Sequence, residues 1–84
     1  MNNVKEFRDK KEMYNFIRDV ITLNTGDSVV VRVLHTLTPE KFEGVYKVHI
    51  YADEICLESD RAVFLLSRFI EALLSQTITA KILR

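Results

Sequence analysis

The chain has 84 residues, 48% of them hydrophobic, and its 12 basic and 12 acidic side chains give a formal net charge of zero. This length suits a single core, so we expect one domain over residues 1–84. The hydrophobic share excludes a disordered chain. The balanced charge argues against nucleic-acid binding, because neutralising phosphates requires an excess of Lys and Arg.

Neither a membrane span nor a disulfide is expected. No apolar run reaches the roughly 18–20 residues that cross a bilayer, and the N-terminal residues lack the regions of a signal peptide. Cys56 is the single cysteine, so an intrachain disulfide cannot form and a reducing compartment is the default. We therefore expect a cytoplasmic protein without a membrane partner.

The first periodic segment predicts a helix that begins near Lys10. Asp9 suits the N-cap, and Glu12 stands three residues later, which is the spacing of a capping box. Residues 4–7 are then an extended or frayed lead-in, and Gly26 suits the turn that follows the helix. The apolar face recurs at helical spacing and consists of Met13, Tyr14, Phe16, Ile17, Val20, Ile21 and Leu23.

Residues 28–37 (SVVVRVLHTL) are rich in β-branched side chains and predict a strand. The charge of Arg32 indicates which side faces outward. The connection that follows carries Thr38 and Pro39 in the order of a helix N-cap and first turn, so it predicts one helical turn. Alternation gives an inner set of Val29, Val31, Val33 and His35 and an outer set of Ser28, Val30, Arg32 and Leu34.

Two more strands, residues 45–52 and 55–58, are expected to form a hairpin. Two registers fit their alternation. In the first, Cys56 lies opposite His49. In the second, Cys56 lies opposite Tyr51. The inward side chains are Tyr46, Val48, Ile50, Ile55 and Leu57, and the outward ones are Val45, Lys47, His49, Tyr51, Cys56 and Glu58.

Residues 60–76 (DRAVFLLSRFIEALLSQ) predict the helix around which the core forms, capped by Ser59 or Asp60. A helix that lies on a sheet alone needs an apolar stripe of about 100°. This apolar arc is wider, so we expect the first helix as a second neighbour. Phe64 breaks the pattern, because it projects into the polar strip as an edge-packed aromatic or as an anchor for another chain. The arc consists of Ala62, Val63, Leu65, Leu66, Phe69, Ile70, Ala72, Leu73 and Leu74.

Residues 77–83 alternate again and predict a fourth strand. The order α-β-β-β-α-β predicts an α+β fold of two layers, with both helices on one face of a four-stranded, mostly antiparallel sheet. We place the last strand beside the first, in the order 4-1-2-3. The third strand, the second helix and the last strand are expected to form a parallel, right-handed crossover.

The outer face of this sheet is the predicted binding surface. It mixes apolar and polar side chains, as expected of a face that packs against another subunit or protein. We therefore expect a small non-enzymatic adaptor, regulator or inhibitor that binds another protein or itself, with a homodimer favoured. The predicted contact residues are Arg32, Val45, Lys47, His49, Tyr51 and Phe64.

The rival interpretation is a small enzyme or metal-dependent regulator that uses His49 and Cys56 on the same face. A metal site needs three or four converging ligands. The sequence has no spaced motif such as C-x-x-C and no glycine-rich phosphate loop, so we expect neither metal nor cofactor. A local acidic run has two interpretations, solvated turn residues with a helix cap or a knob for a basic partner. It consists of Asp53, Glu54, Glu58 and Asp60.

Overall fold

The computed structural model describes residues 4–34 and 43–83, which form two helices and a five-stranded antiparallel sheet. The α+β class is confirmed, and the predicted four-stranded sheet is one strand short. Two predictions lie outside the described residues, the helical turn after Thr38 and the inward position of His35. The predicted first strand, residues 28–37, is too long, because β1 ends at Val33 and Leu34 is not part of it. The elements are α1 (Lys10–Val20), β1 (Ser28–Val33), β2 (Gly44–Tyr51), β3 (Glu54–Glu58), β4 (Val63–Leu65), α2 (Leu66–Leu74) and β5 (Ile78–Leu83).

Helix α1 begins where its capping residues predict. The Asp9 side chain accepts a hydrogen bond from the Glu12 backbone N–H at 2.9 Å, which satisfies one of the free donors of the first turn. The Glu12 carboxylate in turn accepts from the Arg8 Nε at 2.8 Å. The regular helix ends at Val20, and Gly26, with a φ of 99°, supplies a left-handed turn before β1.

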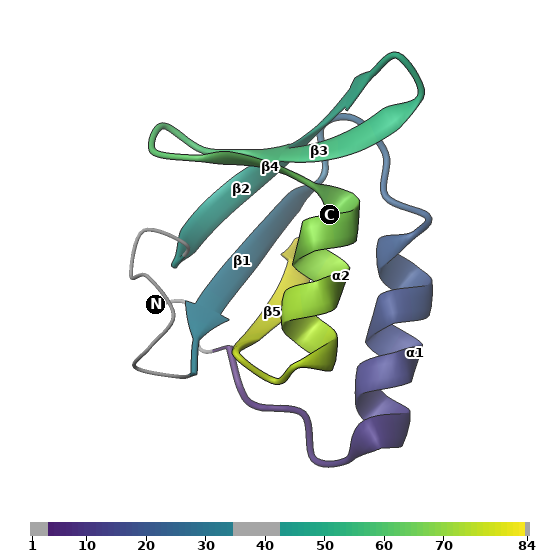
Figure 1. Ribbon diagram of the computed structural model, residues 1–84, viewed down its shortest axis with the longest axis vertical. Coiled ribbons are helices and arrows are strands. Elements are labelled where there is room, and N and C mark those ends of the chain that lie inside the picture. Colours follow the sequence, from purple (N-terminus) through teal and green to yellow (C-terminus); the bar gives the residue numbers. More distant parts are fainter. Residues whose placement is uncertain (1–3, 35–42, 84) are drawn as a thin grey trace.

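The strand order of the sheet is β4-β3-β2-β1-β5, and each neighbouring pair is antiparallel. The placement of the last strand beside the first is confirmed. The predicted parallel crossover from the third strand is wrong, because β4 reverses the chain once more before α2. As a result β5 runs antiparallel to β3, and the two edge strands β4 and β5 run in the same direction (Figure 1).

Both helices lie on one face of the sheet, with α2 across the strands and α1 beside α2 (Figure 1). Helix α1 is therefore the second neighbour that the wide apolar arc of residues 60–76 predicts. The side chains that face each other in this layer form one core cluster. Its buried members are Val20, Leu23, Val29, Val31, Tyr46, Val48, Leu57, Phe69, Leu73, Ile78 and Ala80.

Residues 60–65 are not helical, which corrects the predicted start of the second helix. The Ser59 hydroxyl accepts the Ala62 N–H at 3.1 Å, while the Ser59 N–H donates to the Ala62 carbonyl at 2.8 Å. These bonds close a turn, after which β4 pairs with β3. Helix α2 starts after Leu65, which makes no side-chain cap bond, so the predicted cap at Ser59 or Asp60 is wrong.

The same change moves Phe64 from a helix to a strand. Phe64 lies opposite Leu57 on the face of the sheet that carries the helices. Its ring centroid is 4.9 Å from that of Tyr46 and 6.4 Å from that of Phe69. The predicted projection into a polar helix strip is therefore wrong, and the half-buried ring packs against the core.

Candidate functional site

The register of the sheet determines which side chains share its outer face, the face opposite the helices. His49 lies opposite Cys56 and Lys47 opposite Glu58, so the structure has the first of the two predicted hairpin registers. Side chains of directly opposed residues project to the same side of a sheet. The outer face therefore carries Ser28, Val30, Arg32, Val45, Lys47, His49, Tyr51, Glu54, Cys56, Glu58, Val63, Leu65, Thr79, Lys81 and Leu83.

The lead-in before α1 covers the area around Val30 and Thr79 on β1 and β5, while Leu83 on β5 stays 42% exposed. The Arg32 guanidinium donates to the Val4 carbonyl at 3.1 Å, and the Thr79 hydroxyl donates to the Lys5 carbonyl at 2.8 Å. Val4 and Thr79 are buried, as is Val30 between them. Arg32, a predicted contact residue, is thus engaged within its own chain.

We call the part over β2, β3 and β4 the open face, because most of its side chains are exposed. Its four large apolar side chains retain between 41% and 59% of their accessible surface. Two of them, Val45 and Tyr51, come from β2, and the other two, Val63 and Leu65, come from β4. The open face consists of these four together with Lys47, His49, Glu54, Cys56 and Glu58.

A hydrogen-bonded aromatic pair occupies the centre of the open face. The rings of His49 and Tyr51 stack with centroids 4.4 Å apart and an interplanar angle of 21°. The Tyr51 hydroxyl donates to Glu58 Oε1 at 2.6 Å, and His49 Nδ1 lies 3.6 Å from the same oxygen. The hydrogen bond to Glu58 is the main cause that raises the pKa of Tyr51, and desolvation adds to it.

Cys56 lies opposite His49 in the sheet, with 6% of its surface exposed. A buried thiol is poorly accessible to substrates and reagents. Across residues 4–34 and 43–83, no three His, Cys, Asp or Glu side chains converge as metal ligands. The residues of the rival interpretation are thus neighbours in the sheet, but they do not form an accessible nucleophile or a ligand set.

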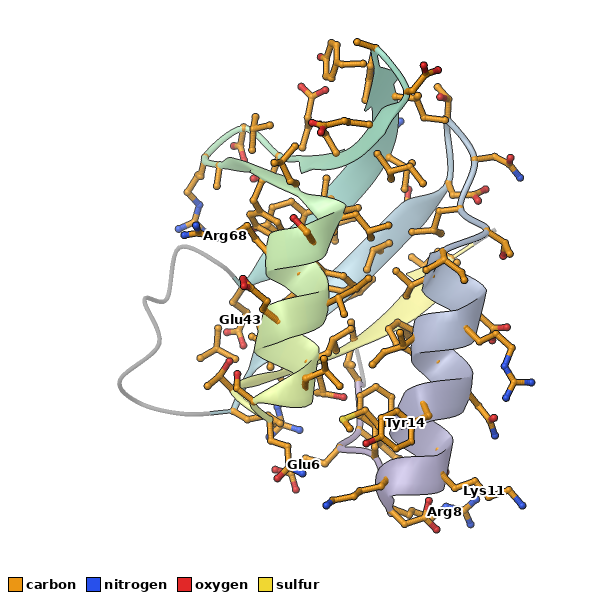
Figure 2. The ribbon with its side chains drawn as sticks, turned by 45° about the vertical axis from the view of Figure 1, so that its right-hand side comes forward. Glu6, Arg8, Lys11, Tyr14, Glu43 and Arg68 are labelled. Carbon is orange, nitrogen blue, oxygen red and sulfur yellow. The ribbon has the colours of Figure 1, made fainter. Side chains whose placement is uncertain are left out.

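A groove of about 850 Å³ lies on the helical side of the molecule, between α2 and β4. Arg61, Arg68 and Glu71 stand on its rim, and Phe64 and Phe69 are among its apolar lining residues. Figure 2 shows Arg68 and Glu43 on this side of α2, away from α1. Val63 and Leu65 line this groove and also belong to the open face, so the two surfaces meet along β4.

The open face contains four of the six predicted contact residues and adds two that the sequence did not indicate. Val45, Lys47, His49 and Tyr51 project outward from β2 as predicted. Val63 and Leu65 were missed because they were assigned to the apolar arc of a helix. The β-branched and aromatic pair Val63-Phe64 is a signal for a strand within that helical pattern.

Among the described elements, neither helix has the length and apolar character needed to cross a membrane. Comparisons with protein families, with curated proteins and with solved structures found no match to this chain.

Proposed function

We propose that this chain is a small, non-enzymatic interaction module that binds another protein through its open face. The observation that carries the proposal is the group of four half-exposed apolar side chains on the open face, which includes Tyr51 of the stacked His49–Tyr51 pair. Scattered single apolar residues are normal on protein surfaces, whereas a contiguous group with a polar centre is typical of an interface.

The energetics support coverage of this face. Fully burying one large apolar side chain contributes roughly 1.5–3 kcal/mol, so covering the exposed halves of four such side chains would contribute roughly 3–6 kcal/mol. The polar groups also suit an interface, because the Glu58 carboxylate already has a donor in Tyr51. Burying a carboxylate with a hydrogen-bonded partner costs less than burying it alone.

The proposal is tested by charging the open face. Val45→Glu and Val63→Glu each place a carboxylate at an exposed strand position, and Ile21→Glu does the same at an exposed position after α1. We expect the two open-face variants to fold, as judged by circular dichroism, and to lose partners that the wild type and Ile21→Glu retain. The readouts are light scattering for self-association and affinity capture from the native host with mass spectrometry.

Two results would overturn the proposal. One is open-face variants that keep every partner and the mass of the wild type. The other is Ile21→Glu losing the same partners as Val63→Glu, because the effect would then not depend on the face.

A further inference from the structure

We propose that the partner of the open face is a second copy of this chain, related by a twofold axis that crosses the strands near His49 and Cys56. This inference rests on the proposed function, since it uses the same surface. Twofold symmetry is the commonest way in which soluble proteins form oligomers, because one self-complementary patch serves both subunits.

Two opposite charges on the open face lack partners within the described chain. Lys47 lies opposite Glu58, but the Glu58 carboxylate is engaged by Tyr51 and His49 instead. Lys47 therefore makes no ion pair with another described residue, and neither does Glu54 at the other end of the hairpin. The two residues stand on adjacent strands about 13 Å apart along the strand direction, too far to pair with each other.

The positions of these charges are related by the proposed axis. Lys47 and Glu54 lie two residues to either side of the His49–Cys56 pair, in opposite directions along the hairpin. For two sheets that pack face to face, the twofold axis lies between them and parallel to them. When this axis crosses the strands at the His49–Cys56 pair, the rotation exchanges the two ends of the hairpin. Lys47 of each copy then meets Glu54 of the other, and one contact of opposite charges occurs twice. Such complementarity contributes to specificity and register.

The same rotation places apolar side chains on apolar side chains. Val63 and Leu65 project from β4 at the levels of Glu58 and Cys56. The axis runs obliquely to the strands, from the His49–Cys56 pair to a point on β4 between Val63 and Leu65, so it brings Val63 of one copy against Leu65 of the other. Faces of two sheets pack about 10 Å apart, so side chains of this size fill the space between them.

The test exchanges the two charges. Lys47→Glu creates two contacts of like charge in a homodimer, and so does Glu54→Lys. Each variant alone should weaken the affinity of the dimer at least about tenfold. In light scattering at tens of micromolar each variant should have a mass near 9.8 kDa, and the wild type near twice that mass. An equimolar mixture of the two variants restores both contacts and should recover the dimer. Lys11→Glu, at an exposed position on α1, is the matched control and should leave the dimer intact (Figure 2).

A mixture that stays monomeric would overturn the proposed axis, as would single variants that dimerise like the wild type. A wild-type mass near 9.8 kDa at these concentrations would overturn the second copy as the partner. The proposed function fails separately, because a monomeric wild type leaves its affinity-capture test with Val45→Glu and Val63→Glu in force.

Discussion

The two adjacent leucines at the end of α2 provide a matched test of the core. Leu73 is 0% exposed and belongs to the central cluster, whereas Leu74 is 49% exposed. Both changes to Ala alter helix propensity equally, so the difference between them isolates burial. Leu73→Ala removes fully buried carbons and leaves a cavity, at a cost of about 3–4 kcal/mol. Leu74→Ala forfeits about half of a transfer free energy, about 1 kcal/mol.

Urea unfolding followed by circular dichroism measures both values. A small domain has an m-value of about 1–3 kcal/mol/M, so Leu73→Ala should lower the unfolding midpoint by about 1–4 M. The variants must be compared at one protein concentration, because dissociation of an oligomer makes the apparent stability depend on concentration. Equal midpoints for the two variants, or a larger effect at Leu74, would show that the placement of α2 on the sheet is incorrect.

Further outcomes are expected at the α1 cap, at the Tyr51–Glu58 bond and at Cys56. Asp9→Ala should destabilise the fold by about 1 kcal/mol in the same assay, since it removes the N-cap of α1; an unchanged midpoint would contradict the cap. Glu58→Gln should lower the raised pKa of Tyr51, as measured by alkaline spectrophotometric titration. The stabilisation linked to this raised pKa is present below the ordinary tyrosine pKa of about 10, and it is lost as the pH rises through the pKa of Tyr51 in the folded state. In Tyr51→Phe the free energy of unfolding should therefore fall less steeply over this alkaline range. Cys56 should react much more slowly with a thiol reagent in the folded than in the unfolded protein, and Cys56→Ser should leave binding intact; one zinc per chain in elemental analysis, lost in Cys56→Ser, would instead support the rival interpretation.

Local signals in the sequence predicted the elements whose stabilising contacts are local. The Asp9 cap, the start of α1 and the alternation of β2 depend on neighbours a few residues away, and all three are confirmed. The hairpin register was open because both alignments keep Ile50 and Leu57 inside, and only the complete sheet distinguishes them.

The helix over residues 60–76 shows where periodicity misleads. Its apolar residues are so dense that they fit a strand and a helix equally well over a short stretch. Phe64 was the one residue that did not fit the helix, and it lies within the segment that is a strand. The edge of β3 decides the outcome, because pairing with it satisfies the backbone of residues 63–65 and buries one side of Phe64.

Burial on the outer face could not be predicted from alternation at all. Val30 and Thr79 point away from the helices, yet both are buried beneath the lead-in. The Thr79 hydroxyl bonds a carbonyl near the other end of the chain, and no periodic pattern reports a contact between such distant residues. The identity of the residues left on the open face follows from this coverage.

The position of β5 beside β1 has a consequence for how the chain reaches its native state. The β1–β2 hairpin can form early, but the second edge of β1 is satisfied only by the last strand of the described chain. Contacts between distant segments slow folding. Until β5 arrives, the valine-rich edge of β1 presents unpaired backbone groups that can template pairing with another chain, and Arg32 is the single charge along it. Refolding yield should therefore fall as protein concentration rises, even where the native protein is fully stable.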